Sequence, residues 1–125
     1  MEKFGTVLEC MDGRTQRKVA DYLTTSFGVR HLDTITTAGT IQHLARDTDQ
    51  TPALLANVAV SVERHGSTQI AVVAHHDCAG NPVPDKVQKQ QVAAAAARLH
   101  DLYPRAEVIG LWVGENWILE RIKTP

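Results

Sequence analysis

The chain has 125 residues, 43% of them hydrophobic, which suits one compact domain over residues 1–125 and is too short for two. Its formal net charge of −1 excludes the broad basic surface that a nucleic-acid partner requires. Because it has neither an apolar run of about 18 to 20 residues nor a secretory signal, we expect a cytoplasmic protein without a membrane partner.

Runs rich in Val and Ile alternate with stretches of helical periodicity, which predicts an α/β fold. We expect a Rossmann-like, three-layer domain with a mostly parallel sheet. The first strand is predicted over residues 6–10, and the second lies within residues 29–37. Between them a helix begins near Thr15 and stops at Gly28. Its predicted core face carries four residues, Val19, Tyr22, Leu23 and Phe27.

The segment 51–66 predicts the next helix, with Thr51 as N-cap, Pro52 in the first turn and Gly66 after its end. Its core positions are predicted to be Leu54, Leu55, Val58 and Val62. In the following run, residues 69–76, positions 70–74 are all apolar and do not alternate with polar residues. This pattern is typical of a central strand covered by helices on both faces.

The spacing of Asp85 and Gln88 resembles a capping box at the start of a further helix that ends before Pro104. Its predicted apolar stripe comprises Val92, Ala95, Ala96, Leu99 and Leu102. The five alanines at 93–97 favour a helix packed closely on the sheet. Residues 107–113 predict the fourth strand, whereas 116–122 fit either a short edge strand or a terminal helical turn. We expect the strand order 2-1-3-4, with a possible edge strand added.

Reactive side chains follow two of the predicted strands. Cys10, Asp12 and Arg14 come at the end of the first strand, and their spacing by two would point all three the same way in an extended chain. His75 and Cys78 come at the end of the third strand. In open α/β sheets ligands bind beyond the carboxyl ends of the strands, so with this strand order the two groups are expected to meet.

Two thiolates and one imidazole are suitable zinc ligands, and three protein ligands leave the open position that a catalytic zinc site needs. Other interpretations exist for each residue alone. A buried cysteine is often a small hydrophobic residue, a histidine can satisfy backbone groups, Asp12 with Gly13 can form a turn, and Arg14 can be a solvated charge. Cys10 and Cys78 could also act as a redox pair that joins the strand ends.

The two motifs together, "CMDGR" at 10–14 and "HHDC" at 75–78, resemble the C-x-D-x-R and H-x-x-C motifs of the β-class carbonic anhydrases. The resemblance implies zinc bound by Cys10, His75 and Cys78, with His75 rather than His76 at the ligand position. It also implies that Arg14 holds Asp12 beside the metal as the catalytic pair. The implied reaction is hydration of carbon dioxide to bicarbonate by a zinc-bound hydroxide.

The stretch "TTAG" at 36–39 resembles the Ala-Gly loop of that family, which implies that Ala38 and Gly39 line the substrate pocket. The resemblance also implies a homodimer or larger homo-oligomer. The alternatives are hydrolysis of carbonyl sulfide or carbon disulfide, and a non-catalytic zinc-binding or redox role.

The chain departs from the family pattern at several positions. Gly13 replaces the usual serine, a pair of threonines replaces Arg-Asn before the Ala-Gly loop, and Ala79 precedes Gly80. Only nine residues precede Cys10, where the family has an N-terminal helical arm. These departures bear on the substrate more than on the metal.

Overall fold

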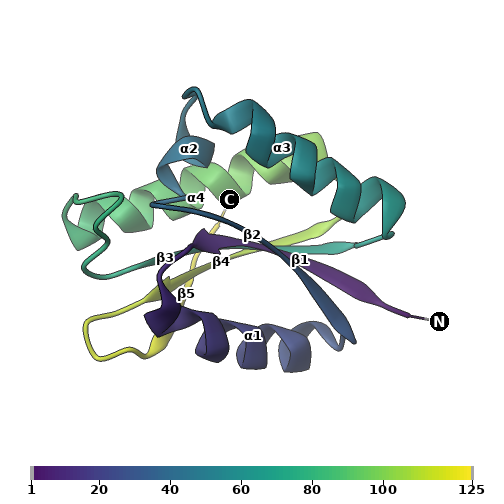
Figure 1. Cartoon of the computed structure of the whole chain (residues 1–125), viewed down its shortest axis with the longest axis horizontal. Helices are drawn as coiled ribbons and strands as arrows, with labels where there is room; N and C mark the ends of the chain where they lie inside the picture. The colour runs from purple at the N-terminus through teal and green to yellow at the C-terminus, as the bar shows by residue number, and fades with distance from the viewer. Residues whose placement is uncertain (1, 125) are drawn as a thin grey trace.

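A computed structural model describes residues 2–124 and contains a five-stranded sheet in the order β2-β1-β3-β4-β5 (Figure 1). The strands are β1 (Phe4–Cys10), β2 (His31–Thr37), β3 (Gln69–His75), β4 (Glu107–Val113) and β5 (Leu119–Ile122). The first four strands are mutually parallel, and β5 pairs antiparallel with β4. The α/β class and the predicted order are therefore confirmed, and the undecided segment after β4 forms an edge strand.

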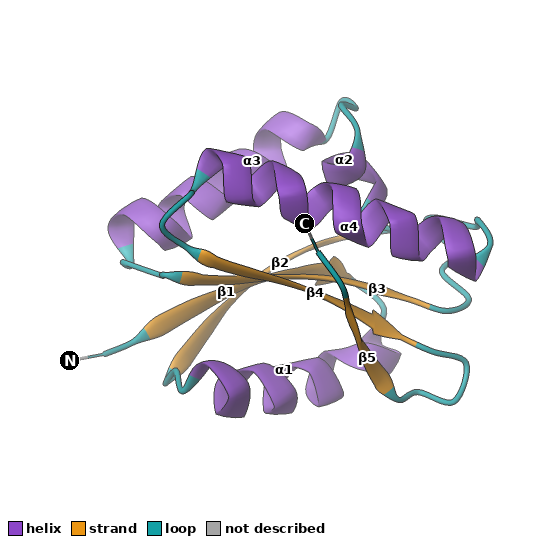
Figure 2. Ribbon diagram, turned by 180° about the vertical axis from the view of Figure 1, so that it is seen from behind, coloured by secondary structure: helices purple, strands orange, loops and turns teal. Residues whose placement is uncertain are grey.

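Helices cover both faces of the sheet, which gives three layers (Figure 2). Helix α1 (Gly13–Phe27) lies on one face, and α2 (Gln42–Ala45), α3 (Thr51–Ala59) and α4 (Asp85–Leu102) lie on the other. The connections that follow β1 and β3 therefore leave on opposite faces of the sheet, which opens a crevice at the carboxyl ends of these two strands. No helix within residues 2–124 is long and apolar enough to cross a membrane.

Each layer boundary has its own hydrophobic core, because neighbouring strand residues point to opposite faces. Val7 belongs to the cluster that packs on α1, whereas the adjacent Leu8 belongs to the cluster that packs on α2 to α4. Ala95 and Ala96 are buried in the second cluster. The prediction that the alanine run is a helix packed on the sheet is confirmed.

Helix α1 is fixed at both ends by local chemistry. The Asp12 side chain accepts a hydrogen bond from the Arg14 backbone N–H as N-cap, and Gly28 ends the helix in the left-handed conformation at φ 64°. The residues buried along it recur every four positions: Thr15, Val19, Leu23 and Phe27. The prediction that Tyr22 faces the core is wrong, since it lies beside this stripe and is 38% exposed.

Helix α3 begins one residue earlier than a Thr51 cap requires. Its N-cap is Gln50, and the Thr51 hydroxyl instead accepts from the Thr48 N–H and donates to the His43 carbonyl. The predicted helix 51–66 also continues as a π-helical turn, η1 (Val60–Arg64), which buries Ser61. The prediction of a helix in this segment is confirmed. The predicted Thr51 cap is wrong, because the Thr51 hydroxyl bonds the loop before the helix.

The predicted capping box at the start of α4 is wrong. Pro84 is the N-cap without a side-chain hydrogen bond, and Gln88 is buried, where its Oε1 accepts from Trp112 Nε1 at 3.0 Å. Leu102, predicted to face the core, is the last residue of the helix and is 51% exposed. In both cases packing against the sheet decided the outcome, rather than the local sequence pattern.

Candidate metal centre

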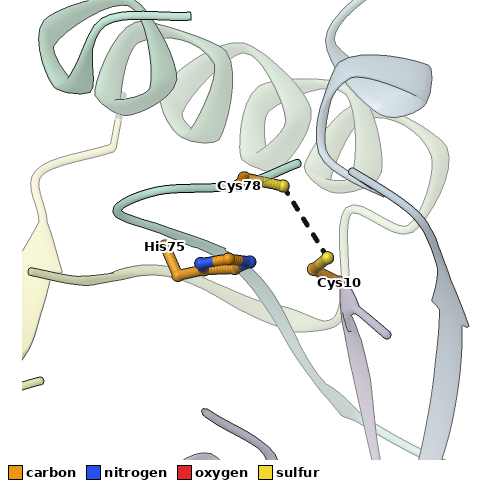
Figure 3. Close-up of side chains that lie close together, drawn as sticks. All are labelled: Cys10, His75 and Cys78. Carbon is orange, nitrogen blue, oxygen red and sulfur yellow. Dashed lines mark hydrogen bonds between the residues drawn. The ribbon is translucent and has the colours of Figure 1, made fainter. Parts of the chain in front are cut away.

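The reactive side chains predicted at the two strand ends lie together in the structure. Cys10 is the last residue of β1, His75 is the last residue of β3, and Cys78 follows three residues later. Because β1 and β3 are adjacent and parallel, their carboxyl ends reach the same edge of the sheet. The ligand atoms of the three residues lie within 4.8 Å of one another, all three side chains are buried, and they point toward one another (Figure 3).

The two thiols are close enough to form a hydrogen bond. Cys10 Sγ and Cys78 Sγ lie 3.7 Å apart, and the Gly39 N–H points at Cys10 Sγ from 3.4 Å. The hydrogen bond from Cys78, with further help from Gly39, lowers the pKa of Cys10 against the opposing effect of burial. The same contact and burial raise the pKa of Cys78. These opposite shifts make Cys10 the first of the two thiols to ionise, and both thiols must lose their protons to bind a metal.

The His75 ring is oriented by a backbone contact. Its Nδ1 lies 2.7 Å from the His76 carbonyl oxygen, and since a carbonyl can only accept, Nδ1 carries the proton. In the neutral ring, which is the form that binds a metal, Nε2 is then left with its lone pair. This atom is buried and has no hydrogen-bond partner within residues 2–124. A buried imidazole lone pair beside two sulfurs fits zinc, which takes cysteine and histidine ligands.

His76 does not take part in this cluster. Its Nδ1 lies 3.0 Å from Asp85 Oδ1, in the first turn of α4. His76 lies just after the end of β3, and its side chain bonds the start of α4 while the His75 ring lies beside the sulfurs.

Asp12 and Arg14 form a bidentate ion pair beside the cluster. Arg14 Nε and Nη2 donate to the Asp12 carboxylate at 3.0 and 2.7 Å, and Asp12 Oδ2 lies 3.8 Å from His75 Nε2. These bonds from Arg14 lower the pKa of Asp12 to about 2, so the carboxylate is ionised at neutral pH. The expected extended geometry of residues 10–14 is wrong. The chain turns into α1 after Cys10, and helix capping brings the pair together instead.

The backbones of the loops after β2 and β3 are in close contact near the cysteines. A Cβ at Gly39, where φ is 63°, would lie 2.6 Å from the Gly80 carbonyl, and a Cβ at Gly80 would lie 2.6 Å from the Ala38 backbone. Gln42 Nε2 also donates to the Gly80 carbonyl at 2.5 Å. Gly39 lines a small space that is also bordered by Cys10, His75 and Cys78 and is too narrow to hold a water molecule. Ala38 contacts Gly80 and is not part of that lining.

Sequence reasoning missed two polar residues near the cluster, Glu9 and Gln88. The Glu9 side chain is buried, burial raises its pKa to about 7, and its Oε1 has no partner in the described part of the chain. Gln88 lines the space beside the cysteines. A charged residue within an apolar strand run was a usable signal for Glu9. Gln88 gave none, because its position matched a capping box.

The fold is that of the β-carbonic anhydrases. A tetrameric β-carbonic anhydrase from the filamentous ascomycete Sordaria macrospora aligns with a TM-score of 0.66 and 12% identity, covering 98% of this chain and 82% of that one. The β-carbonic anhydrase CcaA aligns with a TM-score of 0.60 and 15% identity, covering 98% and 81%. The enzyme CafA of the fungal pathogen Aspergillus fumigatus gives 0.56 and 13%, covering 99% and 78%.

Residues 1–123 match the family described as "Putative carbonic anhydrase", and the chain belongs to this family. No curated protein matches the sequence. The family membership agrees with the resemblance that the motifs at 10–14 and 75–78 predicted.

Proposed function

We propose that the protein hydrates carbon dioxide to bicarbonate with zinc held by Cys10, His75 and Cys78. Membership of the carbonic anhydrase family supports this function. The observation that carries it is the buried His75 Nε2, which has no hydrogen-bond partner within residues 2–124 and lies beside the sulfurs of Cys10 and Cys78.

Zinc, when bound, supplies Lewis acidity that makes water a nucleophile near neutral pH. The protein's own contribution is to place an ionised acceptor beside that water. The Asp12 carboxylate lies 3.8 Å from His75 Nε2 and can accept a hydrogen bond that orients the nucleophile. Arg14 holds the same carboxylate in a bidentate pair, which keeps it from occupying the open ligand position itself.

Zinc content and carbon dioxide hydration should be measured on one preparation of the full chain. We expect about one zinc ion per chain, and hydration activity that is lost on chelation and restored by zinc. Carbonyl sulfide and carbon disulfide should be assayed alongside. Stoichiometric zinc without hydration activity would contradict the proposal, and faster turnover of a sulfur compound would reassign the substrate.

A second candidate is a redox function of the cysteine pair, which the 3.7 Å separation of the two Sγ atoms favours. In the metal-free chain, exchange with a small disulfide would join Cys10 to Cys78 and release two small thiols, so that two electrons pass from the pair to the added disulfide. Thiol counting before and after zinc removal tests this candidate. Two free thiols that persist under a glutathione disulfide challenge would exclude it.

We further propose a cytoplasmic homo-oligomer that acts on a small molecule. A reducing compartment favours cysteines kept as thiolates for a metal. The relative from Sordaria macrospora is described as tetrameric, which supports self-association.

A further inference from the structure

Two residues with an unusual backbone conformation contact the same side chain. Within residues 2–124, positive φ angles outside glycine occur at Asp77 (59°) and Trp117 (60°). These residues are distant in sequence and lie in different loops, yet both touch the guanidinium of Arg14. Such conformations are disfavoured, persist only where surrounding contacts enforce them, and cluster at functional sites.

Trp117 covers one face of the guanidinium. Its ring centroid lies 4.8 Å from Arg14 Cζ, within the range of a cation–π contact. The turn between β4 and β5 that carries it is anchored, because the Trp117 N–H donates to the Gly114 carbonyl at 2.8 Å and Lys18 Nζ donates to the Trp117 carbonyl at 2.8 Å. Lys18 lies one turn after Arg14 on α1, so the whole turn is held against the start of that helix.

Asp77 accepts hydrogen bonds from the guanidinium N–H groups that do not bond Asp12. Arg14 Nη2 donates to the Asp77 carbonyl at 3.0 Å, and Arg14 Nη1 donates to Asp77 Oδ2 at 3.3 Å. Asp77 directly precedes Cys78, so this contact joins the loop of the cysteine to the helix of the arginine.

We propose that Asp77 and Trp117 are positioning residues that hold Arg14 in the orientation in which it grips Asp12. The inference deepens the proposed function and rests on it. The Arg14 side chain is 47% exposed, and a long side chain at such exposure samples several rotamers unless its neighbours restrict it. With the ring on one face and Asp77 on the outer edge, the guanidinium keeps Nε and Nη2 directed at Asp12.

The test is an NMR measurement, in the zinc-containing protein, of how fast the Arg14 Nε–H exchanges with solvent. The signal is assigned by its absence in Arg14→Lys. Trp117→Leu should speed its exchange with solvent about threefold to fivefold, the size of a partly exposed cation–π contact. Asp77→Asn, which tolerates positive φ and keeps the backbone carbonyl, should speed exchange about twofold. Trp117→Phe retains a ring face and should stay close to wild type.

Two substitutions distant from Arg14 serve as controls. Trp112→Phe changes the buried tryptophan that bonds Gln88, and Asp49→Asn changes an exposed carboxylate. Neither should alter the Arg14 signal. Unchanged exchange in both Trp117→Leu and Asp77→Asn would overturn the proposal, as would an equal effect of Trp112→Phe. If Trp117→Leu does not fold, the surface substitution Asp77→Asn decides.

Hydration kinetics separate this inference from the function on which it rests. Trp117→Leu should lower kcat about threefold to fivefold at full zinc content, and it should cost nothing further in an Arg14→Lys background, because it acts through Arg14. Wild-type protein without hydration activity would contradict the proposed function, while the NMR result would still decide whether Asp77 and Trp117 hold Arg14.

Discussion

At the residue scale, the orientation of two adjacent histidines leads to a selective prediction about metal binding. His75→Ala, Cys10→Ser and Cys78→Ser should each lose most of the zinc, because each removes one of the three clustered ligand atoms. His76→Ala should keep it, since that ring bonds Asp85 instead. Zinc per chain, measured by plasma emission spectrometry, is the readout. Full zinc retention by His75→Ala would contradict the ligand set.

The bidentate pair of Asp12 and Arg14 predicts a non-additive loss of activity. Arg14→Ala should keep zinc but lower hydration at least about tenfold, because the released carboxylate can occupy the open ligand position. Asp12→Ala should also keep zinc and lose activity. The double substitution should cost no more than about twofold beyond Arg14→Ala, as expected for residues that act as one unit.

Kinetics of the two single variants and the double variant test this coupling. Losses that simply multiply would show that the two side chains act independently. Wild-type turnover in Arg14→Ala would show that the arginine is only a surface charge.

At the element scale, the contact between the loops after β2 and β3 predicts strict size limits. Gly80→Ala should destabilise the fold by about 1–3 kcal/mol and lower zinc retention, because the added Cβ would meet the Ala38 backbone at 2.6 Å. Gly13→Ala is the matched control, since nothing lies within 4 Å of a Cβ there and Gly13 begins a helix. Urea unfolding should show Gly13→Ala to be neutral or slightly stabilising. Equal stability of both variants would contradict this packing.

The strands and their order could be predicted because residues buried on both faces leave uninterrupted Val and Ile runs. The meeting of Cys10 with His75 and Cys78 followed from that order alone. Helix caps could not be predicted, because the Thr51 hydroxyl bonds the preceding loop and the Gln88 amide bonds Trp112 on β4, and a capping pattern reveals neither contact.

The surroundings of Arg14 were equally hidden from the sequence. Aspartate tolerates positive φ but does not require it, and a turn pattern does not predict positive φ at a tryptophan such as Trp117. Trp117 packs against the hydrophobic cluster on α1, and its ring also faces the guanidinium. Such a dual contact depends on how the β4–β5 turn docks on α1, which is a tertiary outcome.

At the scale of the whole molecule, exposed apolar residues near the site predict self-association. Met11 and Ile118 are each 63% exposed, and both lie at the carboxyl edge of the parallel strands. We expect a homodimer or larger assembly by light scattering at micromolar concentration. Met11→Glu should weaken it, whereas Leu102→Glu, which changes an exposed leucine at the end of α4, should not. A monomeric wild-type protein would contradict the prediction.

The spacing of the metal ligands along the chain has a consequence for folding. Cys10 and Cys78 are 68 residues apart, and closing a loop of that length in an unfolded chain costs about 4 kcal/mol of entropy. The three zinc ligands therefore come together only after β1 and β3 have paired. The free energy of zinc binding then adds to the stability of the native state. During synthesis Cys10 leaves the ribosome well before β3 does. Strands β1 and β3 must therefore pair before zinc can bind all three ligands.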